Sequence, residues 1–489
     1  MHRKTTKFRK RAELSLIYTL MALAVVGVVA VLILVMQGYR FNKYDGKIEQ
    51  GGLLQYDSQP DGGTVFIDDL KLANQTPNKI TASAGAHTVK MTKPGYVEWK
   101  KDVVVKPGGI LWLNYTRFIP ENRSASAVVP FDSISDTAIS RDKKHLVVKE
   151  NAASPEVSLV NLDTDKPEKT VITFAEDTYT KATDPASGSF TIEEWDRDNR
   201  YVLMNYTFDG KTEWLVLDTR DKKIVNNITM STGVDIRAAS FAYANNRLLY
   251  ALTSANELRR IDLGSNIVSA PLIANVQEFS QYDRSTVVFT TLLDATTKKR
   301  SVGYLTNGAK TPRLLETYAD DGQGALRLSL GRYYNETYAT IAYGDTVDIM
   351  KGDLPASDSA DASTMKQVAR MSVPGGVKYL GFSPDENRQV YAQGASQMVT
   401  YDLELDKAST ISFAHQPGER IRWVDRYHFV TVAGGEVMLY EFDGQNATRI
   451  VSESLALPAD FSPNNKYMYV FTAQNGKPTL SRVLLQLQD

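Results

Sequence analysis

Short segments in which apolar and polar residues alternate, each ending in a tight turn, recur along most of this chain. The clearest is GFSPDENRQVY at residues 381–391, and DFSPNNKYMYV at residues 460–470 is a close echo of it. In both, proline presets φ at the second turn position and the following Asp or Asn bonds its own backbone, so the chain reverses there. The alternation of aromatic and β-branched residues after the turn predicts a second, half-buried strand.

Eight copies of a strand–turn–strand–turn–strand–strand unit align from residue 124 onward. The turns after the first strand of each copy lie at residues 140–142, 195–199, 243–246, 281–284, 331–334, 383–385, 424–426 and 462–465. Four short strands per copy of roughly 45 residues predict the blades of a β-propeller. We expect eight blades, with seven as the alternative, because the fourth and fifth copies match weakly.

The last copy reaches Asp489 after its third strand. Residues 124–130 precede the first strand of the first copy, and we expect them to supply the missing fourth strand. Such an exchange closes the ring and removes its open edges. The predicted propeller therefore spans residues 124–489.

An apolar run without a charged side chain, LSLIYTLMALAVVGVVAVLILVM, occupies residues 14–36. As a helix it would extend about 34 Å, enough to span a hydrocarbon core of roughly 30 Å. Residues 1–13 hold six basic residues and one acid, which predicts a cytoplasmic tail with the rest of the chain outside. The alternative is a cleaved signal peptide, whose apolar region is normally only about 7–15 residues. We therefore predict a signal-anchor helix over residues 14–37.

A linker over residues 38–51 is expected to lead into a small β domain at residues 52–119. Its predicted strands are residues 53–58, 64–68, 86–90, 98–105 and 111–118, separated by turn signals at residues 60–63, 76–77, 94–95 and 107–109. The strings SQPDGG (58–63), VFID (65–68), TP (76–77), GAHTV (85–89) and GY (95–96) follow one another in the order of a PEGA domain. The segment thus resembles that family of small surface β-sandwiches from bacterial and archaeal envelope proteins, with Gly63 where the family usually has Ala.

The resemblance to the PEGA family implies exposure at the cell envelope and binding rather than a reaction. The repeats resemble those of TolB-type and WD40-like propellers, most closely at FSPD (382–385) and FSPN (461–464). This second resemblance supports the fold more firmly than any function, because propellers host both binding and catalysis.

Composition excludes several kinds of chemistry. The chain has 489 residues and no cysteine, so disulfides, thiolate metal sites and cysteine nucleophiles are absent. Its net charge of −1 divides into +5 for residues 1–13 and −6 for the remainder. An acidic body lacks the basic footprint of a nucleic-acid-binding protein.

Catalytic and metal-binding motifs are also missing. The chain has no Gly-x-Ser-x-Gly elbow, and GASQM at residues 394–398 lacks the second glycine. No phosphate-binding loop or complete dinucleotide fingerprint occurs. The five histidines are scattered, without metal-ligand spacing: His2, His87, His145, His415 and His428. The sequence therefore singles out no catalytic residue, no cofactor-binding residue and no metal ligand, and no cofactor is expected.

A few local features admit two interpretations. The acidic segments at residues 163–165 and 196–199 have oxygen ligands at short spacing, as a calcium loop would, but ordinary blade turns are favoured. For His87 we favour a structural role over metal binding. For Trp99, Trp112 and Tyr115 we favour packing over a ligand-binding aromatic patch. Residues 355–364, PASDSADAST, are expected to form a mobile surface loop.

Together these features predict an all-β protein with one N-terminal transmembrane helix, a PEGA-like β-sandwich and a β-propeller. The expected function is that of a membrane-anchored, extracytoplasmic binding or scaffold protein, not an enzyme. Its expected partners are the membrane, crossed once, and an envelope protein or cell-wall polymer, but not nucleic acid. The alternative is an enzyme acting on cell-surface glycan or peptide in the propeller channel, which would need converging carboxylates. A third hypothesis is signalling or assembly through the short N-terminal tail.

Overall fold

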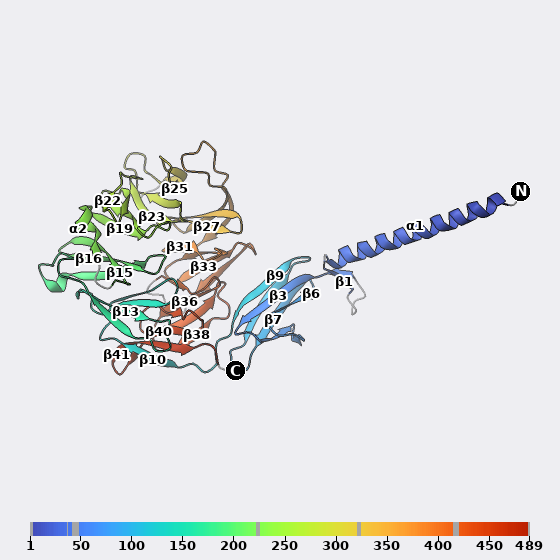
Figure 1. The fold of residues 1–489 in the computed structure, drawn as a ribbon, viewed down its shortest axis with the longest axis horizontal. Helices are drawn as coiled ribbons and strands as arrows, with labels where there is room; N and C mark the ends of the chain where they lie inside the picture. The colour runs from blue at the N-terminus through green and yellow to red at the C-terminus, as the bar shows by residue number, and fades with distance from the viewer. Residues whose placement is uncertain are drawn as a thin grey trace. The chain divides into compact units, whose positions relative to one another are not determined.

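The computed structural model describes residues 3–36, 38–41, 48–221, 225–319, 324–413 and 420–487. The chain forms two compact units, Met1–Asn122 and Arg123–Asp489. The first contains the helix and the small β domain, and the second contains the repeats. Strands dominate both units, so the all-β class is confirmed (Figure 1).

Helix α1, Arg3–Met36, begins within the predicted basic tail and continues through the whole apolar run. Its segment Arg11–Met36 is the one stretch in the described part of the chain that is long and apolar enough to cross a membrane. Apolar side chains cover all of its faces, and none of this segment is buried within the protein. An exposed helix that is apolar all round is typical of a membrane span.

Two short strands, β1 (Tyr39–Phe41) and β2 (Ile48–Gln50), pair antiparallel between the helix and the small domain. The segment expected to be a linker therefore contains regular structure at both of its described ends. Residues 42–47 lie outside the described part of the chain.

The small domain consists of two sheets. The first has the order β6-β3-β9, in which β3 and β9 run parallel, and the second has the order β5-β4-β7-β8. The strands are β3 (Gly52–Gln59), β4 (Thr64–Ile67), β5 (Leu70–Lys71), β6 (Asn78–Ala82), β7 (Gly85–Thr92), β8 (Trp99–Val105) and β9 (Ile110–Arg117). Strands β5 and β6 were missed by the sequence analysis, because β5 has only two residues and β6 shows no clean alternation.

The core of the small domain includes the side chains of Tyr56, Trp99 and Phe118, all at most 2% exposed. A Cβ atom on Gly63 would lie only 2.7 Å from the Phe118 ring. The departure from the usual alanine at this turn thus lets Phe118 pack directly against the backbone.

The second unit contains eight four-stranded sheets in its described residues, and in seven of them the strands follow one another in chain order. The eighth has the order β10-β41-β40-β39 and joins the two ends of the unit. Figure 1 shows the sheets succeeding one another around a ring, as in a β-propeller. The strands of the first four sheets are β11 (Asp136–Ile139), β12 (His145–Lys149), β13 (Glu156–Asn161), β14 (Lys169–Thr173), β15 (Ser189–Trp195), β16 (Tyr201–Phe208), β17 (Lys211–Asp218), β18 (Val225–Asn227), β19 (Ile236–Phe241), β20 (Leu248–Thr253), β21 (Leu258–Asp262), β22 (Ile267–Val268), β23 (Val276–Gln281), β24 (Thr286–Thr291), β25 (Lys299–Thr306) and β26 (Arg313–Ala319).

The remaining sheets complete the ring. Their strands are β27 (Leu326–Tyr333), β28 (Glu336–Tyr343), β29 (Thr346–Gly352), β30 (Lys366–Ser372), β31 (Tyr379–Phe382), β32 (Gln389–Gln393), β33 (Gln397–Asp402), β34 (Lys407–Ser412), β35 (Arg422–Trp423), β36 (His428–Ala433), β37 (Glu436–Glu441), β38 (Thr448–Val451), β39 (Asp460–Phe461), β40 (Tyr467–Gln474), β41 (Lys477–Leu484) and β10 (Ala125–Pro130). A short helix, α2 (Ile228–Thr232), and a 3-10 turn, η1 (Pro185–Ser187), are the other helical elements described.

The predicted closure is present, because β10 pairs antiparallel with β41 across the two ends of the unit. Apolar packing supports it: Val129 and Phe131 share one core cluster with Leu146 of the first sheet and Phe471 of the last. Equivalent clusters fill the seams between other neighbouring sheets, such as the one that joins Val147 to Trp195. The ring is therefore held by sheet-to-sheet packing, since the chain has no disulfide.

Two expectations need correction. The fifth repeat turns later than predicted, because β27 continues to Tyr333 and the turn is made by Tyr334, whose φ is +51°. The loop at residues 355–364 was expected to be mobile, yet Ser357 is 4% exposed and its hydroxyl donates to the Thr311 carbonyl at 2.7 Å. The Arg313 guanidinium binds the carbonyls of Ser357, Ser359 and Asp361, which fastens the loop to β26.

Candidate functional site

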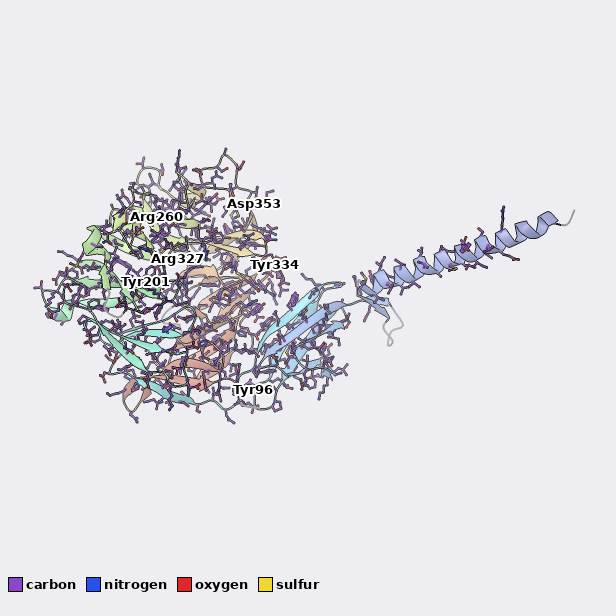
Figure 2. The ribbon with its side chains drawn as sticks, in the orientation of Figure 1. Tyr96, Tyr201, Arg260, Arg327, Tyr334 and Asp353 are labelled. Atoms are coloured by element: carbon purple, nitrogen blue, oxygen red, sulfur yellow. The ribbon has the colours of Figure 1, made fainter. Side chains whose placement is uncertain are left out.

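First strands of neighbouring sheets lie against one another, as β11 does against β15 and β27 against β31, and the eight first strands line the middle of the ring. Figure 2 shows Arg327, on the first strand β27, near the middle of the ring, whereas Tyr334 and Asp353 lie at its margin. Two cavities open along these first strands, and both are lined by Arg420. They form the candidate site.

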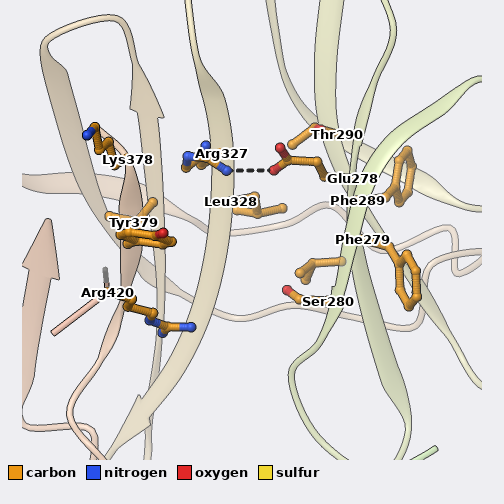
Figure 3. Close-up of a pocket in the computed structure, with 12 residues that line it drawn as sticks. Glu278, Phe279, Ser280, Phe289, Thr290, Arg327, Leu328, Lys378, Tyr379 and Arg420 are labelled. Atoms are coloured by element: carbon orange, nitrogen blue, oxygen red, sulfur yellow. Dashed lines mark hydrogen bonds and ion pairs between the residues drawn. The ribbon is translucent and has the colours of Figure 1, made fainter. Parts of the chain in front are cut away.

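The first cavity, of about 170 Å³, lies between β23, β24, β27 and β31 (Figure 3). Its polar lining consists of Glu278, Ser280, Thr290, Arg327, Lys378, Tyr379 and Arg420. The aromatic rings of Phe279 and Phe289 and the side chain of Leu328 complete the wall. Its residues come from segments up to more than 100 positions apart, which the curved succession of neighbouring sheets brings together.

The second cavity has a volume of about 710 Å³ and lies beside β35. Residues of β31 and β36 and of the segment just before β39 border it as well. Arg141, Glu193, Arg420 and Arg422 supply its charges. Phe382, Tyr391 and Trp423 supply aromatic surface. With the first cavity it gives the ring interior a wall in which charged and aromatic groups alternate.

Cationic side chains outnumber carboxylates in the two linings, five to two. Two of the five are neutralised locally: Arg327 lies 2.8 Å from Glu278, and Arg422 lies 2.7 Å from Asp460. The other three, Arg141, Lys378 and Arg420, are exposed, and none of them lies within ion-pair distance of a carboxylate of the described residues. The Arg420 guanidinium instead donates to the Tyr391 hydroxyl and lies 5.7 Å from the centres of the Tyr379 and Tyr391 rings.

Each cavity also contains a buried polar atom without a hydrogen-bond partner in the described protein. In the first it is Oγ1 of Thr290, a residue only 3% exposed, and in the second it is the indole Nε1 of Trp423. Buried polar groups are rarely left unsatisfied in folded proteins, because each costs about 1–3 kcal/mol. Both atoms are themselves buried, so the two cavities are lined by residues with an unsatisfied polar group behind their surface.

Three carboxylates lie on or next to the first strands of the first two sheets, and one of them, Glu193, lines the second cavity. Burial is the main factor that raises the pKa values of Asp136, Glu193 and Glu194, and the charge of Asp136 raises that of Glu193 further. Two of these carboxylates accept hydrogen bonds from backbone amides of the next sheet. Asp136 accepts from the Ile192 amide at 2.7 Å, and Glu194 accepts from the Phe241 amide at 2.6 Å. These acids therefore join successive sheets.

The residues weighed in the sequence have structural roles. Asp196 is 1% exposed, and its Oδ1 accepts from the amides of Arg200 and Tyr201, both at 2.7 Å, as a blade turn requires. His87 lies 2.6 Å from one carboxylate, that of Asp68. No group of three or more potential metal ligands occurs among the described residues.

The aromatic residues weighed in the small domain mostly belong to its core. Trp99 and Tyr115 are 2% and 7% exposed, and their rings meet edge-on with centroids 6.2 Å apart. Trp112 is half-buried. The packing interpretation of Trp99 and Tyr115 is therefore correct.

The sequence analysis did not identify Lys378, Arg420 or Trp423. Each lies at or just before the first strand of a repeat, the strand that borders the channel. That position is the one signal by which sequence could have found them. It does not distinguish side chains that enter a cavity from those that pack between sheets.

Residues 52–117 match the PEGA domain family. The propeller resembles solved structures at low sequence identity. The β-propeller domain of Cps50 (Swd1) from Myceliophteria thermophila is 10% identical over 75% of this chain and 100% of its own, with a TM-score of 0.40. The Dos1 propeller is 12% identical over 74% and 94%, with a TM-score of 0.46.

An oligogalacturonate lyase in complex with manganese is 13% identical over 74% of this chain and 99% of its own, with a TM-score of 0.40. These likenesses concern the fold alone and carry no information on activity. No curated protein sequence matches the chain.

Proposed function

We propose that this chain, in which a PEGA domain and a β-propeller follow an apolar N-terminal helix, is a membrane-anchored, extracytoplasmic binding protein. The helix crosses the membrane once, with residues 1–13 in the cytoplasm and the PEGA domain and propeller outside. The propeller presents the interior of its ring to an envelope protein or a cell-wall polymer. The PEGA domain serves as the spacer between the membrane and the binding unit.

The observation that carries the binding role is the pair of cavities that share Arg420. Their linings combine exposed cations with aromatic rings, which is the mixture typical of ligand sites. Ring closure by β10 and β41 supports the proposal further, because a closed ring holds these groups in place before a ligand arrives.

Anchoring to the membrane allows a single binding domain to bind ligands at the cell surface effectively. A propeller tethered to the membrane meets surface ligands at a local concentration set by the length of its tether. The basic residues that precede the apolar run support an orientation with the N-terminus in the cytoplasm.

An enzyme in the propeller channel is less well supported. Glycan hydrolysis requires two carboxyl groups that face the substrate, one of them as a proton donor. In the ring interior, Asp136 and Glu194 are bonded to backbone amides, and Glu193 accepts from the Asn205 side chain. We therefore propose binding without chemical conversion.

The test uses the full-length protein in detergent, immobilised through its N-terminus. Purified cell-wall polymer and solubilised envelope proteins are offered separately, and the supernatant is analysed for soluble fragments. Retention of one of the two classes, without fragments, is the expected result. Retention of neither class contradicts the binding role, and release of fragments from the polymer contradicts the proposed absence of catalysis.

A further inference from the structure

We infer that the two cavities form one elongated site for an anionic glycan, a sugar chain that bears carboxylate or phosphate groups. Lys378 and Arg420 bind the anionic groups, and Tyr379 and Trp423 contact the sugar rings. This inference rests on the proposed binding function and assigns its ligand class and residues.

The charge of the ligand follows from the cations that have no carboxylate partner among the described residues. Lys378 and Arg420 line the first cavity, Arg420 and Arg141 line the second, and all three are exposed. The neighbouring Arg327 and Arg422 are already paired with carboxylates, so these three cations set the local charge. Cations gathered in a cleft with low-dielectric walls concentrate anions there and strengthen the bonds they form.

The extended shape of the ligand follows from the position of Arg420. This residue lines both cavities, which otherwise have no lining residue in common. A single inorganic ion would occupy one cavity at most. A chain with several anionic groups can occupy both and contact Arg420 at their junction.

The sugar character follows from the aromatic groups. The Tyr379 ring is 37% exposed in the lining of the first cavity, next to Lys378 and Arg420 (Figure 3). In the second cavity the half-buried Trp423 indole supplies further aromatic surface. Flat aromatic surface suits a sugar ring with apolar faces, whereas an acidic peptide would need backbone partners as well.

The experiment measures binding by the full-length protein in detergent, by calorimetry at low and high salt. The probes are a hyaluronan hexasaccharide, a phosphomannan oligosaccharide of similar length, uncharged maltohexaose and hexaglutamate. The variants are Lys378→Gln, Arg420→Gln, Tyr379→Ala and Trp423→Phe. The matched control is Lys407→Gln, which removes an exposed cation from β34, the last strand of the sheet that β31 begins. Melting curves of all variants check that the fold is intact.

We expect the hyaluronan or the phosphomannan to bind, more weakly at high salt. The comparison of the two identifies which anionic group is preferred. Lys378→Gln and Arg420→Gln should each weaken binding about tenfold, the factor associated with one charge-assisted hydrogen bond. Trp423→Phe should weaken it by a smaller factor, since it reduces the aromatic surface but keeps a ring. Tyr379→Ala should also weaken it, whereas Lys407→Gln should not.

The inference is overturned if maltohexaose binds as well as the charged glycans, if hexaglutamate binds more tightly than either, or if neither charged glycan binds. It is also overturned if Lys407→Gln weakens binding as much as Lys378→Gln does. The Lys378 side chain forms no hydrogen bond or ion pair with the described part of the chain, so its variant remains informative even if Arg420→Gln unfolds the protein. If an envelope protein is retained equally by the wild type and by Lys378→Gln, the binding function stands and this site assignment fails.

Discussion

A guanidinium nitrogen of Arg422 lies 2.7 Å from a carboxylate oxygen of Asp460, which joins the first strands of two successive propeller sheets. Asp460 is 2% exposed, and its other carboxylate oxygen lies 3.0 Å from the ammonium of Lys143, in the turn between β11 and β12. One buried carboxylate therefore connects the last sheet of the ring to the sheets on both of its sides. Asp460 therefore links the two ends of the propeller through ion pairs, as β10 and β41 link them through backbone hydrogen bonds.

Replacement of Asp460 by Asn should destabilise the propeller. The substitution leaves two partly buried cations without a counter-charge, which costs about 2–4 kcal/mol. A lower midpoint of thermal unfolding, followed by tryptophan fluorescence, checks this. The matched control is Asp132→Asn, which breaks an exposed pair with Lys477 in the same sheet and should leave the unfolding midpoint nearly unchanged, because water screens exposed ion pairs. Equal effects of the two substitutions would show that Asp460 does not hold the ring together.

Lys149 should make stability rise with pH. Its side chain is fully buried against the Phe190 ring, and burial lowers its pKa to about 8. Between pH 8 and about 10 the unfolded chain binds more protons than the folded one, so the free energy of unfolding increases, by roughly 2 kcal/mol.

Urea unfolding at pH 7, 8.5 and 10 measures this increase. Lys149→Met should abolish it, because the variant has no group that titrates differently in the two states at this position. Lys144→Met, which removes a lysine from the exposed pair with Asp163, should retain it. If Lys149→Met retains the full increase, another group is responsible.

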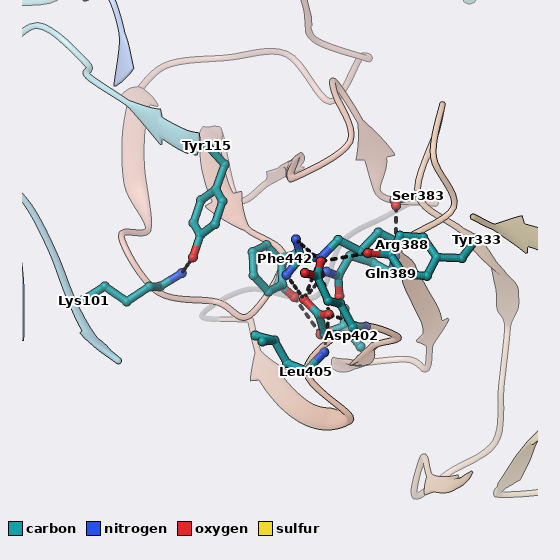
Figure 4. Close-up of polar contacts among 11 residues, drawn as sticks. Lys101, Tyr115, Tyr333, Ser383, Arg388, Gln389, Asp402, Leu405 and Phe442 are labelled. Carbon is teal, nitrogen blue, oxygen red and sulfur yellow. Dashed lines mark hydrogen bonds and ion pairs between the residues drawn. The ribbon is translucent and has the colours of Figure 1, made fainter. Parts of the chain in front are cut away.

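Tyr333 should make stability fall at higher pH. Burial raises its pKa, and its hydroxyl donates to Glu404 at 2.7 Å, which raises the pKa further. Figure 4 shows it beside the buried pair of Arg388 and Asp402. The folded state holds the phenol proton more tightly than the unfolded state does, so the free energy of unfolding decreases above about pH 10.

Tyr333→Phe should reduce this decrease, and at pH 7 it should cost about 1–2 kcal/mol for the lost bond to a charged acceptor. The control is Tyr379→Phe, at an exposed tyrosine on the first strand of the next sheet, which should alter neither quantity. The measurement is urea unfolding at pH 7, 10 and 11. An unchanged pH slope in Tyr333→Phe contradicts the assignment.

The membrane orientation can be tested with single cysteines, because the natural chain has none. Cells that carry Ser452→Cys, at an exposed position of the propeller, should react with a membrane-impermeant maleimide. Cells that carry Thr5→Cys should react only after permeabilisation. The opposite pattern would place the propeller in the cytoplasm and contradict the proposed function. Release of the Ser452→Cys protein from washed membranes would indicate cleavage after the apolar run.

The sequence by itself determined those features that depend on neighbouring residues. Strands and turns follow from alternation and from the Pro-Asp and Pro-Asn pairs, both of which act within a few positions. The uninterrupted apolar run was sufficient to predict the helix. The closing strand was also predictable, because the last repeat lacks one strand and the segment before the first repeat supplies one.

The tertiary structure decided which side chains meet. Arg422 and Asp460 are 38 positions apart, and Lys143 reaches the same carboxylate from the other end of the propeller. The composition of residues 355–364 is typical of a mobile loop, but Arg313 binds three backbone carbonyls of this loop and holds it in place. Lys378 and Arg420 share a cavity because the ring brings their strands to one side of its interior. Local pattern cannot specify such contacts, since they depend on how each sheet packs against the next around a closed ring.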